Sequence, residues 1–279
     1  MKPTFLIIGA AKCGTTTLYD MLSRHPEIGM SCRKEPRFFA EDAVYARGMA
    51  WYESLFEGCA GRRAVGEASP QYTQCDRFPL AAERIARDLP EARLIYIVRH
   101  PLARMESHWM HMRRNGRAAA ALPFSLGLRR IPVLVDASRY WKQISRYRER
   151  FPDERILVLF LEDLTARPQE TLRTCLSFLG VDAVPEAMGE LACRNAAPQQ
   201  LQRSPLLRLV RRVPGYRLVR QLGPSRLNGL LHDRPVRPRW SAALRAWAWS
   251  QVKDDAAALL QSCGKPLDFW NPDWVEARR

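Results

Sequence analysis

The sequence lacks the usual signs of disulfide bonding, structural zinc binding and membrane insertion. Its seven cysteines are scattered, and no two of them form a C-x-x-C pair, which argues against a disulfide framework or a zinc site. No run of roughly 18 apolar residues is present, so we expect no membrane-spanning helix. The apolar run from Phe5 to Ala11 is short and is followed by Lys12, which argues against a signal peptide. We therefore expect a reducing compartment and a cytoplasmic location.

Acidic residues are scarce relative to basic ones. The 279 residues include 44 Lys and Arg but 29 Asp and Glu, for a formal net charge of +15. Eleven arginines and one acidic residue, Asp233, fall between residues 195 and 245. This excess favours an anionic partner, but charge alone does not distinguish nucleic acid, lipid head groups, a polyanionic sugar and a phosphorylated cofactor. The 47% apolar and 26% charged content is otherwise that of a globular protein.

Short β-branched runs alternate with helical stretches along the chain. The predicted strands are Phe5–Gly9, Ala64–Ala68, Leu94–Arg99 and Ile156–Leu161. The predicted helices are Thr15–Arg24, Pro101–Asn115, Pro168–Leu179 and Ser241–Cys263. Alternation of this kind indicates parallel strands joined by crossover helices, so the predicted fold class is α/β.

The segment Gly9 to Thr17 (GAAKCGTTT) lies between the first predicted strand and the first predicted helix. Free N–H groups and the positive end of the helix dipole make such a helix start an anion site. The glycines allow close approach of the backbone, Lys12 adds a charge, and the threonines add donors. A plain turn capped by a threonine is the alternative, but three threonines exceed what a cap needs. The segment therefore predicts a phosphate-binding loop.

A nucleoside-triphosphate kinase fits this loop poorly. Its loop would carry a lysine directly after the second glycine, whereas here Lys12 lies inside the loop and Thr15 follows Gly14. A kinase would also need an acidic residue after a second strand to hold Mg²⁺, and here the strand that ends at Val98 is followed by Arg99. Nevertheless, a kinase remains the first alternative.

Arg99 and Ser107 form a second candidate anion site. Carboxyl ends of parallel strands meet at one crevice, so Arg99 is expected to face the same ligand as the loop. Ser107 lies on the predicted helix face opposite the apolar stripe of that helix. A surface serine and an arginine in an ordinary salt bridge are the alternative.

Together these motifs resemble the sulfotransferases that use 3′-phosphoadenosine 5′-phosphosulfate. The segment FLIIGAAKCGTTTL resembles their 5′-phosphosulfate loop, and IVRHPLARMESHW resembles their 3′-phosphate motif. The segments ILVLFLEDL, RPQETLR and KPLDFW follow in the family's order. The resemblance implies a P-loop-NTPase-like parallel sheet flanked by helices, in one domain over residues 1–279. The arginine and proline content of residues 195–240 favours an Arg-rich insertion or lid on this domain. The resemblance also implies cofactor contacts from Lys12, Cys13, Gly14, Thr15, Thr16, Thr17, Arg99 and Ser107.

The segment Arg33 to Phe39 (RKEPRFF) resembles the carbohydrate-type members of the family, in which the glutamate is the catalytic base. This implies that Glu35 takes the proton of the acceptor hydroxyl, with Lys12 as the second catalytic residue. A glutamate at a helix N-terminus before Pro36 is the alternative. Glu67, in the segment GEASPQY, is the competing carboxylate.

The sequence departs from the heparan-sulfate-type pattern in two places. Ala68 stands where those enzymes commonly have a lysine, which argues against a heparan acceptor. Their glycine-rich loop over the 3′-phosphate and the adenine has no clear counterpart here. The nearest segment is HDRPVR, in which Arg234 and Arg237 are the candidate cofactor-binding residues.

Two other features are better explained without special chemistry. His108 and His111 are three residues apart on a predicted helix, but no nearby carboxylate or cysteine completes a ligand set, so no metal is expected. They would instead line the acceptor cleft or the surface. Cys13 lies near positive charge, which lowers thiol pKa values, yet a small loop residue is the simpler role.

We therefore expect an enzyme that moves a sulfuryl group to a hydroxyl, or an amine, of a glycan, glycolipid or metabolite. The donor is 3′-phosphoadenosine 5′-phosphosulfate and the product is adenosine 3′,5′-bisphosphate (PAP). We interpret the basic segment 195–245 as part of an acceptor cleft for anionic or lipid-linked substrates, with a peripheral membrane contact left open. No nucleic-acid partner is expected, although a basic protein that binds nucleic acid or membranes is the second alternative. The sequence does not determine the oligomeric state.

Overall fold

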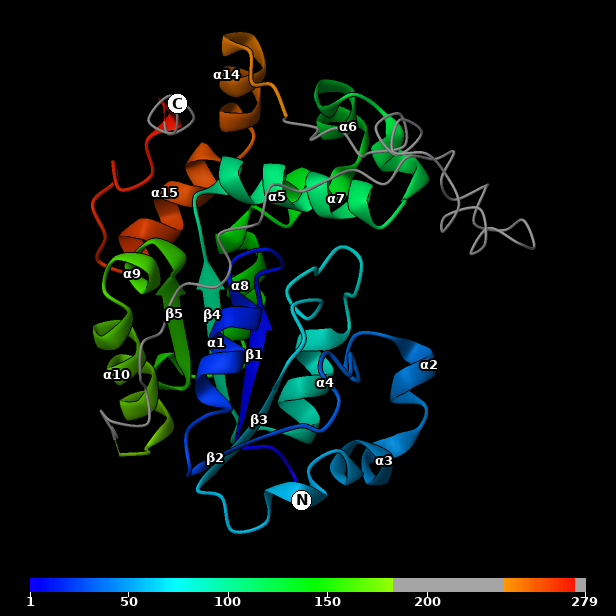
Figure 1. Cartoon of the computed structure of the whole chain (residues 1–279), viewed down its shortest axis with the longest axis vertical. Coiled ribbons are helices and arrows are strands. Elements are labelled where there is room, and N and C mark those ends of the chain that lie inside the picture. Colours follow the sequence, from blue (N-terminus) through cyan, green and yellow to red (C-terminus); the bar gives the residue numbers. More distant parts are fainter. Residues whose placement is uncertain (183–237, 274–279) are drawn as a thin grey trace, which may run out of the picture.

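A parallel β-sheet lies at the centre of the computed structural model, which describes residues 1–182 and 238–273 (Figure 1). Within these residues the sheet has five strands in the order β2-β3-β1-β4-β5, and every neighbouring pair is parallel. The strands are β1 (Phe5–Gly9), β2 (Ile28–Met30), β3 (Ala64–Ala68), β4 (Arg93–Val98) and β5 (Ile156–Phe160). The predicted α/β class and the four predicted strands are confirmed, to within one residue at each strand end.

Strand β2 is the one strand in the described part that the sequence pattern missed. It has three residues and lies at the sheet edge beside β3. Its central residue is Gly29, where a Cβ would lie 2.5 Å from Cys59 Cβ. Close packing requires a glycine at the centre of β2, and three residues form too short an apolar run to mark a strand.

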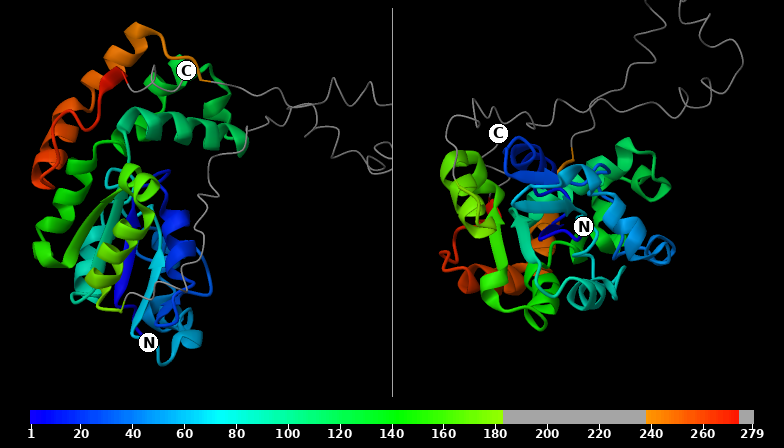
Figure 2. Two further views of the ribbon diagram at one scale, coloured as in Figure 1. Left: turned by 60° about the vertical axis from the view of Figure 1, so that its left-hand side comes forward. Right: turned by 90° about the horizontal axis from the view of Figure 1, so that it is seen from below.

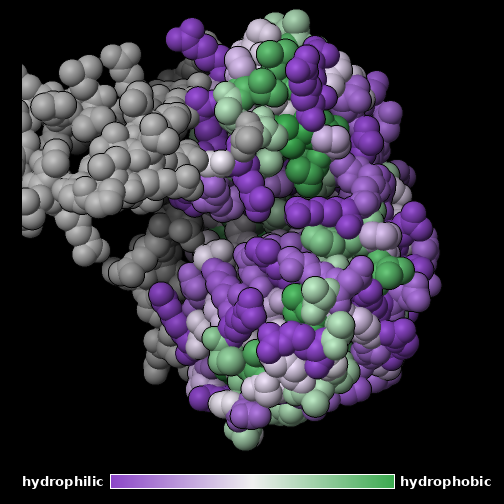
Figure 3. All heavy atoms as spheres, turned by 90° about the vertical axis from the view of Figure 1, so that its right-hand side faces the viewer, coloured by the Kyte–Doolittle hydropathy of each residue, from purple (hydrophilic) through white to green (hydrophobic). Residues whose placement is uncertain are grey.

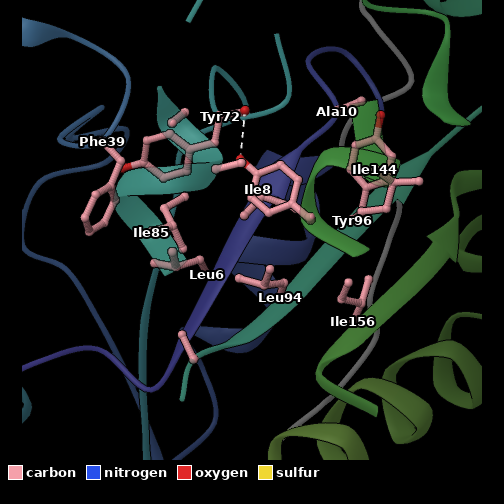
Figure 4. Packing of buried hydrophobic residues seen from close by; sticks show 14 of the residues in the cluster. Leu6, Ile8, Ala10, Phe39, Tyr72, Ile85, Leu94, Tyr96, Ile144 and Ile156 are labelled. Carbon is pink, nitrogen blue, oxygen red and sulfur yellow. Dashed lines mark hydrogen bonds between the residues drawn. The ribbon is translucent and has the colours of Figure 1, made fainter. Parts of the chain in front are cut away.

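Helices cover both faces of the sheet (Figure 2). Leu6 and Ile8 of β1 face one layer, which contains α4, α8 and α15, and Figure 4 shows this packing at close range. Phe5 and Ile7 face the other layer, which contains α1, α9 and α10. Alternate residues of a strand point to opposite faces, so a strand buried on both faces reads as one apolar run. The helices of these two layers are α1 (Thr15–Leu22), α4 (Ala81–Asp88), α8 (Tyr140–Arg148), α9 (Leu161–Ala166), α10 (Pro168–Leu179) and α15 (Lys253–Ser262).

A third cluster of helices lies beyond the carboxyl ends of the strands, at the top of Figure 1. Leu102, Met105 and Trp109 of α5 pack there against α6, α7 and α14. The elements are α5 (Pro101–Arg114), α6 (Phe124–Arg130), α7 (Pro132–Asp136) and α14 (Ala242–Ser250), with the short helix η2 (Ala118–Ala121). The remaining short elements are α2 (Asp42–Tyr45), α3 (Gly48–Ser54), η1 (Glu57–Cys59) and η3 (Asp153–Arg155). This arrangement places α5 directly over the strand ends, where the predicted site lies.

The prediction of one terminal helix over Ser241–Cys263 is wrong. The chain forms two helices there, α14 and α15, separated at Gln251 and Val252. Arg139 Nε donates to the Gln251 carbonyl oxygen over 3.1 Å, and the Asp255 carboxylate accepts the first N–H groups of α8. These contacts come from residues about a hundred positions away, so a local pattern could not reveal the break.

None of the helices in the described ranges is long and apolar enough to cross a membrane. The predicted insertion or lid at residues 195–240 lies almost entirely outside the described residues. Arg234 and Arg237 also lie outside them.

Candidate active site at the carboxyl ends of the strands

The loop between β1 and α1 has a backbone that requires both of its glycines. A Cβ on Gly9 would collide with the Thr73 hydroxyl. Gly14 has φ of 95°, in the left-handed region, and a Cβ there would lie 2.7 Å from Leu161 Cδ1. Side chains are therefore excluded from both ends of the loop, as the motif predicted.

The start of α1 leaves backbone donors without a partner. Gly14 is the N-cap, and no side chain caps the helix. Leu18 makes the first backbone bond of the helix, to the Gly14 carbonyl oxygen at 3.0 Å. The N–H groups of Gly14, Thr15 and Thr16 donate to no residue within the described ranges. The alternative of a turn capped by a threonine is therefore wrong, and the helix start has the donors that an anion needs.

Lys12 adds an ammonium group that no carboxylate neutralises within the described part of the chain. Its Nζ lies 3.4 Å from His111 Nδ1 on α5. Burial lowers the pKa of Lys12 and the neighbouring Arg114 lowers it further, while the Glu35 carboxylate raises it. A half-buried cation among other cations favours an anionic ligand.

Arg99 and Ser107 occupy the positions predicted for the second anion site. Arg99 follows β4, and its Nη1 donates to the Lys12 carbonyl oxygen at 3.3 Å. Ser107 is half-buried on α5, three residues from Arg104 and four from His111, which both reach the loop. Such spacing places the three on one helix face. Neither Arg99 nor Ser107 forms an ion pair or hydrogen bond with a carboxylate among the described residues, so the salt-bridge alternative is wrong for Arg99.

Glu35 lies in a loop rather than at a helix N-terminus, since the next helix begins at Asp42. Gln71 Nε2 donates to Glu35 Oε2 at 3.0 Å, and Arg37 Nη2 lies 3.5 Å from the same oxygen. Ser69 Oγ accepts the Arg37 N–H at 3.0 Å. Glu35 and Arg37 have φ of 51° and 59°. Two non-glycine residues in the left-handed region form a strained segment, which these contacts from the loop after β3 hold in place.

The site residues come from three different parts of the chain. Lys12 is on the loop after β1, Arg99 and His111 are on the segment after β4, and Glu35 is on the loop after β2. Seen from the right-hand side of Figure 1, the surface is hollowed between the helices around α5 and the part below them, and hydrophilic residues surround the hollow (Figure 3). The arrangement can bind an anion at the start of α1 and present a carboxylate beside it.

Comparison with known proteins decides the family. A family model described as the sulfotransferase domain matches residues 2–211. The chain belongs to the sulfotransferase domain family. The sulfotransferase from Alicyclobacillus acidocaldarius has a solved structure that is 26% identical and superimposes with a TM-score of 0.69, covering 97% of this chain and 99% of that chain.

Two human sulfotransferases are also similar to this chain. Heparan sulfate glucosamine 3-O-sulfotransferase 6 is 30% identical over 188 residues, which is 65% of this chain and 53% of the human protein. Bifunctional heparan sulfate N-deacetylase/N-sulfotransferase 2 is 26% identical over 198 residues, which is 64% of this chain and 22% of the human protein. The chain therefore spans about half, or less, of the length of these curated relatives.

Glu67, the competing carboxylate, is buried and does not face solvent. Its side chain is 0% exposed, and Oε1 accepts hydrogen bonds from the hydroxyls of Tyr72 at 2.5 Å and Tyr52 at 3.3 Å. Burial raises the pKa of the Glu67 carboxyl to about 7. A fully buried carboxylate cannot reach an acceptor hydroxyl, so Glu67 is a poorer candidate for the base than Glu35. The sequence alone did not distinguish the two carboxylates.

The Glu67 carboxyl makes folding stability depend on pH. Its pKa lies at about 7 in the folded protein, against the usual 4.5, so between these values the folded state holds a proton that the unfolded state has lost. Its contribution is full below the unfolded pKa and falls as the pH rises to the folded pKa, by on the order of 3 kcal/mol. We expect Glu67→Gln to remove this fall and to be more stable than the unsubstituted protein at pH 8. Urea unfolding of both proteins at pH 5 and pH 8 checks this, and a wild-type advantage that grows with pH would contradict it.

Burial keeps the side chains of His108, His111 and Cys13 uncharged at neutral pH. Burial lowers the pKa of His108 to about 2 and that of His111 to about 4, so both rings are neutral at pH 7. No group of three potential metal ligands occurs in the described ranges. Burial raises the pKa of the Cys13 thiol to about 11, and its Sγ lies 3.5 Å from the Tyr140 hydroxyl. Cys13 is thus a neutral, buried loop residue.

Sequence reasoning missed three residues of this candidate site. Gln71 holds Glu35, as described above. Tyr140 donates its hydroxyl to the Arg99 carbonyl oxygen at 2.8 Å and so joins the end of β4 to the loop. Arg104 lies fully buried behind the loop. No sequence signal distinguishes these three polar side chains from their neighbours, and only the three-dimensional contacts show what each one holds.

Proposed function

We propose that this chain transfers a sulfuryl group from 3′-phosphoadenosine 5′-phosphosulfate to a hydroxyl of a glycan, glycolipid or metabolite. One observation carries the proposal: the start of α1 combines unbonded N–H groups with the unneutralised ammonium of Lys12, and the Glu35 carboxylate lies close enough to change the Lys12 pKa. An anion-binding loop with a carboxylate beside it suits a reaction in which an anionic leaving group departs while a base takes a proton.

The residues present fit this donor. When bound, it supplies an activated sulfuryl group attached to its 5′-phosphate. The N–H groups of Gly14, Thr15 and Thr16 and the Lys12 ammonium would hold the 5′ end, and Arg99 and Ser107 would hold the 3′-phosphate. Lys12 then stabilises the charge that develops on the leaving phosphate. Positioning and fixed charge supply most of the rate enhancement in related group transfers.

Glu35 has one carboxylate oxygen available for a proton. Gln71 and Arg37 both contact Oε2, whereas Oε1 has no hydrogen-bond partner within the described residues. We assign Oε1 as the atom that takes the proton of the acceptor as its oxygen bonds to sulfur. Glu35 lies on the acceptor side, since a carboxylate directly against the anionic sulfuryl group would be repelled.

The acceptor is proposed by class only. The relatives named for 3-O-sulfation and N-sulfation of heparan sulfate support a carbohydrate hydroxyl, with an amine as the second choice. The net charge of +15 supports an anionic or lipid-linked acceptor, with a peripheral membrane contact in the second case. Ala68, in place of the usual lysine, argues against heparan sulfate itself.

Sulfur-labelled donor tests the proposal. The protein is incubated with the labelled donor and an extract of the producing cell, and the products are separated and analysed by mass spectrometry. We expect a labelled product heavier than its precursor by one SO₃ group. Label transferred from the terminal phosphate of ATP, with none from the sulfuryl donor, would instead support the kinase alternative.

Arg99→Ala should weaken donor binding more than it slows the chemical step. The variant loses a charge-assisted contact worth about 1.5–3 kcal/mol, so the donor KM should rise about 10- to 100-fold with a much smaller change in kcat. Arg93 is the matched control because it lies at the other end of β4, where its Nη1 donates to the Leu179 carbonyl oxygen at 2.8 Å. Steady-state kinetics of both variants check this, and a fall in kcat at unchanged KM would contradict the assignment of Arg99.

A further inference from the structure

Arg104 is a buried cation with no acidic partner in the described part of the chain. It is 0% exposed, and the groups that form hydrogen bonds with its guanidinium are all neutral. Nε donates to Ser138 Oγ at 2.5 Å, and Nη2 donates to the carbonyl oxygens of Val133 at 3.1 Å and Leu134 at 2.6 Å. Nη1 lies 3.1 Å from His108 Nδ1 and donates to the Ala11 carbonyl oxygen at 3.4 Å.

A charge in this position is costly for the protein alone. Burial of an ion without a counterion costs several kcal/mol even after relaxation, and hydrogen bonds to neutral groups recover only part of it. Burial indeed lowers the pKa of Arg104, but an arginine keeps its proton in proteins. The positive charge therefore persists beside the loop, where a bound phosphate would act as a counterion.

Two arginines hold consecutive carbonyl groups of the loop. Arg104 binds the carbonyl oxygen of Ala11, and Arg99 binds that of Lys12. A carbonyl oxygen is the negative end of a peptide dipole and would repel a phosphate. Fixing both oxygens on arginines keeps them turned away from the start of α1, where the unbonded N–H groups lie.

We propose that Arg104 is a positioning residue for the phosphate loop, which orients the Ala11 carbonyl and adds a buried positive charge to the 5′-phosphate site. It does not touch the ligand, because its side chain is fully buried. This inference rests on the proposed function, since it assumes that the 5′-phosphate of the donor binds at the start of α1. If Arg104 were purely structural, its substitution would affect the binding of every ligand equally. The proposed role predicts an effect only on ligands that carry a 5′-phosphate.

The test compares two nucleotides that differ only at the 5′ end. PAP carries both phosphates, and adenosine 3′-monophosphate lacks the 5′-phosphate. Arg104→Met removes the charge at similar side-chain length, and Arg104→Lys keeps the charge but loses the fork of donors. Arg113→Met is the matched control, because Arg113 lies on the same helix and donates to the carbonyl oxygens of Ala120 and Ala121 rather than to the loop. Dissociation constants are measured by calorimetry well below the unfolding temperature of each variant.

We expect Arg104→Met to weaken PAP binding about 10- to 100-fold, which is the range seen at metal sites when a residue that orients a binding group without touching the ligand is removed, and to leave adenosine 3′-monophosphate nearly unchanged. Arg104→Lys should weaken PAP less, with the same selectivity, and it carries the test if the methionine variant does not fold. Arg113→Met should affect neither ligand. Equal weakening of both ligands, or no weakening of PAP, by an Arg104 variant would overturn the proposal. Failure of the unsubstituted protein to bind PAP would instead count against the proposed function.

Discussion

Lys12→Ala is expected to lower kcat about 100- to 1,000-fold, the range seen when one group that stabilises developing negative charge is removed. The Lys12 Nζ has no carboxylate partner in the described residues and lies near Arg99, Arg114 and His111. Its positive charge is therefore not neutralised by the protein and is available to a bound phosphate. Because the backbone N–H groups remain, donor binding should weaken less than kcat falls.

Initial rates with saturating donor, together with the dissociation constant for PAP, measure the two effects separately. Lys2→Ala is the matched control, since Lys2 precedes the opposite end of β1 and donates to the Asp88 carbonyl oxygen at 3.1 Å. If Lys12→Ala kept wild-type kcat while binding PAP more weakly, Lys12 would be a binding residue only.

Glu35→Gln is expected to lower turnover about 100- to 10,000-fold while donor binding stays near the wild-type value. The glutamine keeps the shape of the side chain and the contact from Gln71, but it cannot take a proton. The effect should be confined to the step in which the acceptor hydroxyl loses its proton, so the KM for the donor should change little.

Glu41→Gln is the control for this variant. Glu41 is the other carboxylate that pairs with Arg37, at 3.2 Å, and it has no place in the proposed mechanism. Steady-state kinetics with the acceptor found by the labelling experiment compare the two variants. Near-wild-type turnover by Glu35→Gln would remove the base assignment, and a fall in turnover by both variants would show that the Arg37 ion pairs matter more than the proton.

The sheet and its phosphate loop were predictable because their signals are local. A strand buried on both faces is a continuous apolar run, as in β4, and a helix start after a glycine-rich turn is recognisable by spacing. Strand β2 was not predicted, because it has three residues and its central residue, Gly29, packs against Cys59. The break between α14 and α15 was not predicted because Arg139 and the first turn of α8, which are distant in the sequence, fix it through Gln251 and Asp255.

The site was predicted less completely than the fold. Spacing and resemblance proposed Lys12 and Glu35 as site residues, and both roles stay predictions. Two carboxylates compete in the sequence, and the 0% exposure of Glu67 distinguishes them. The burial of Arg104 was not predicted, because an arginine in a helix is usually exposed. The contributions of Arg234 and Arg237, the cytoplasmic location and the acceptor stay predictions.

Calorimetric titration of the protein with PAP, and separately with ATP and Mg²⁺, tests the central claim that one site holds an adenosine with phosphates at both its 5′ and 3′ positions. The account predicts that PAP binds in the absence of Mg²⁺ and much more tightly than ATP. The reason is that Arg99 and Ser107 bind the 3′-phosphate, which ATP lacks. Tighter binding of ATP with Mg²⁺ than of PAP would contradict it.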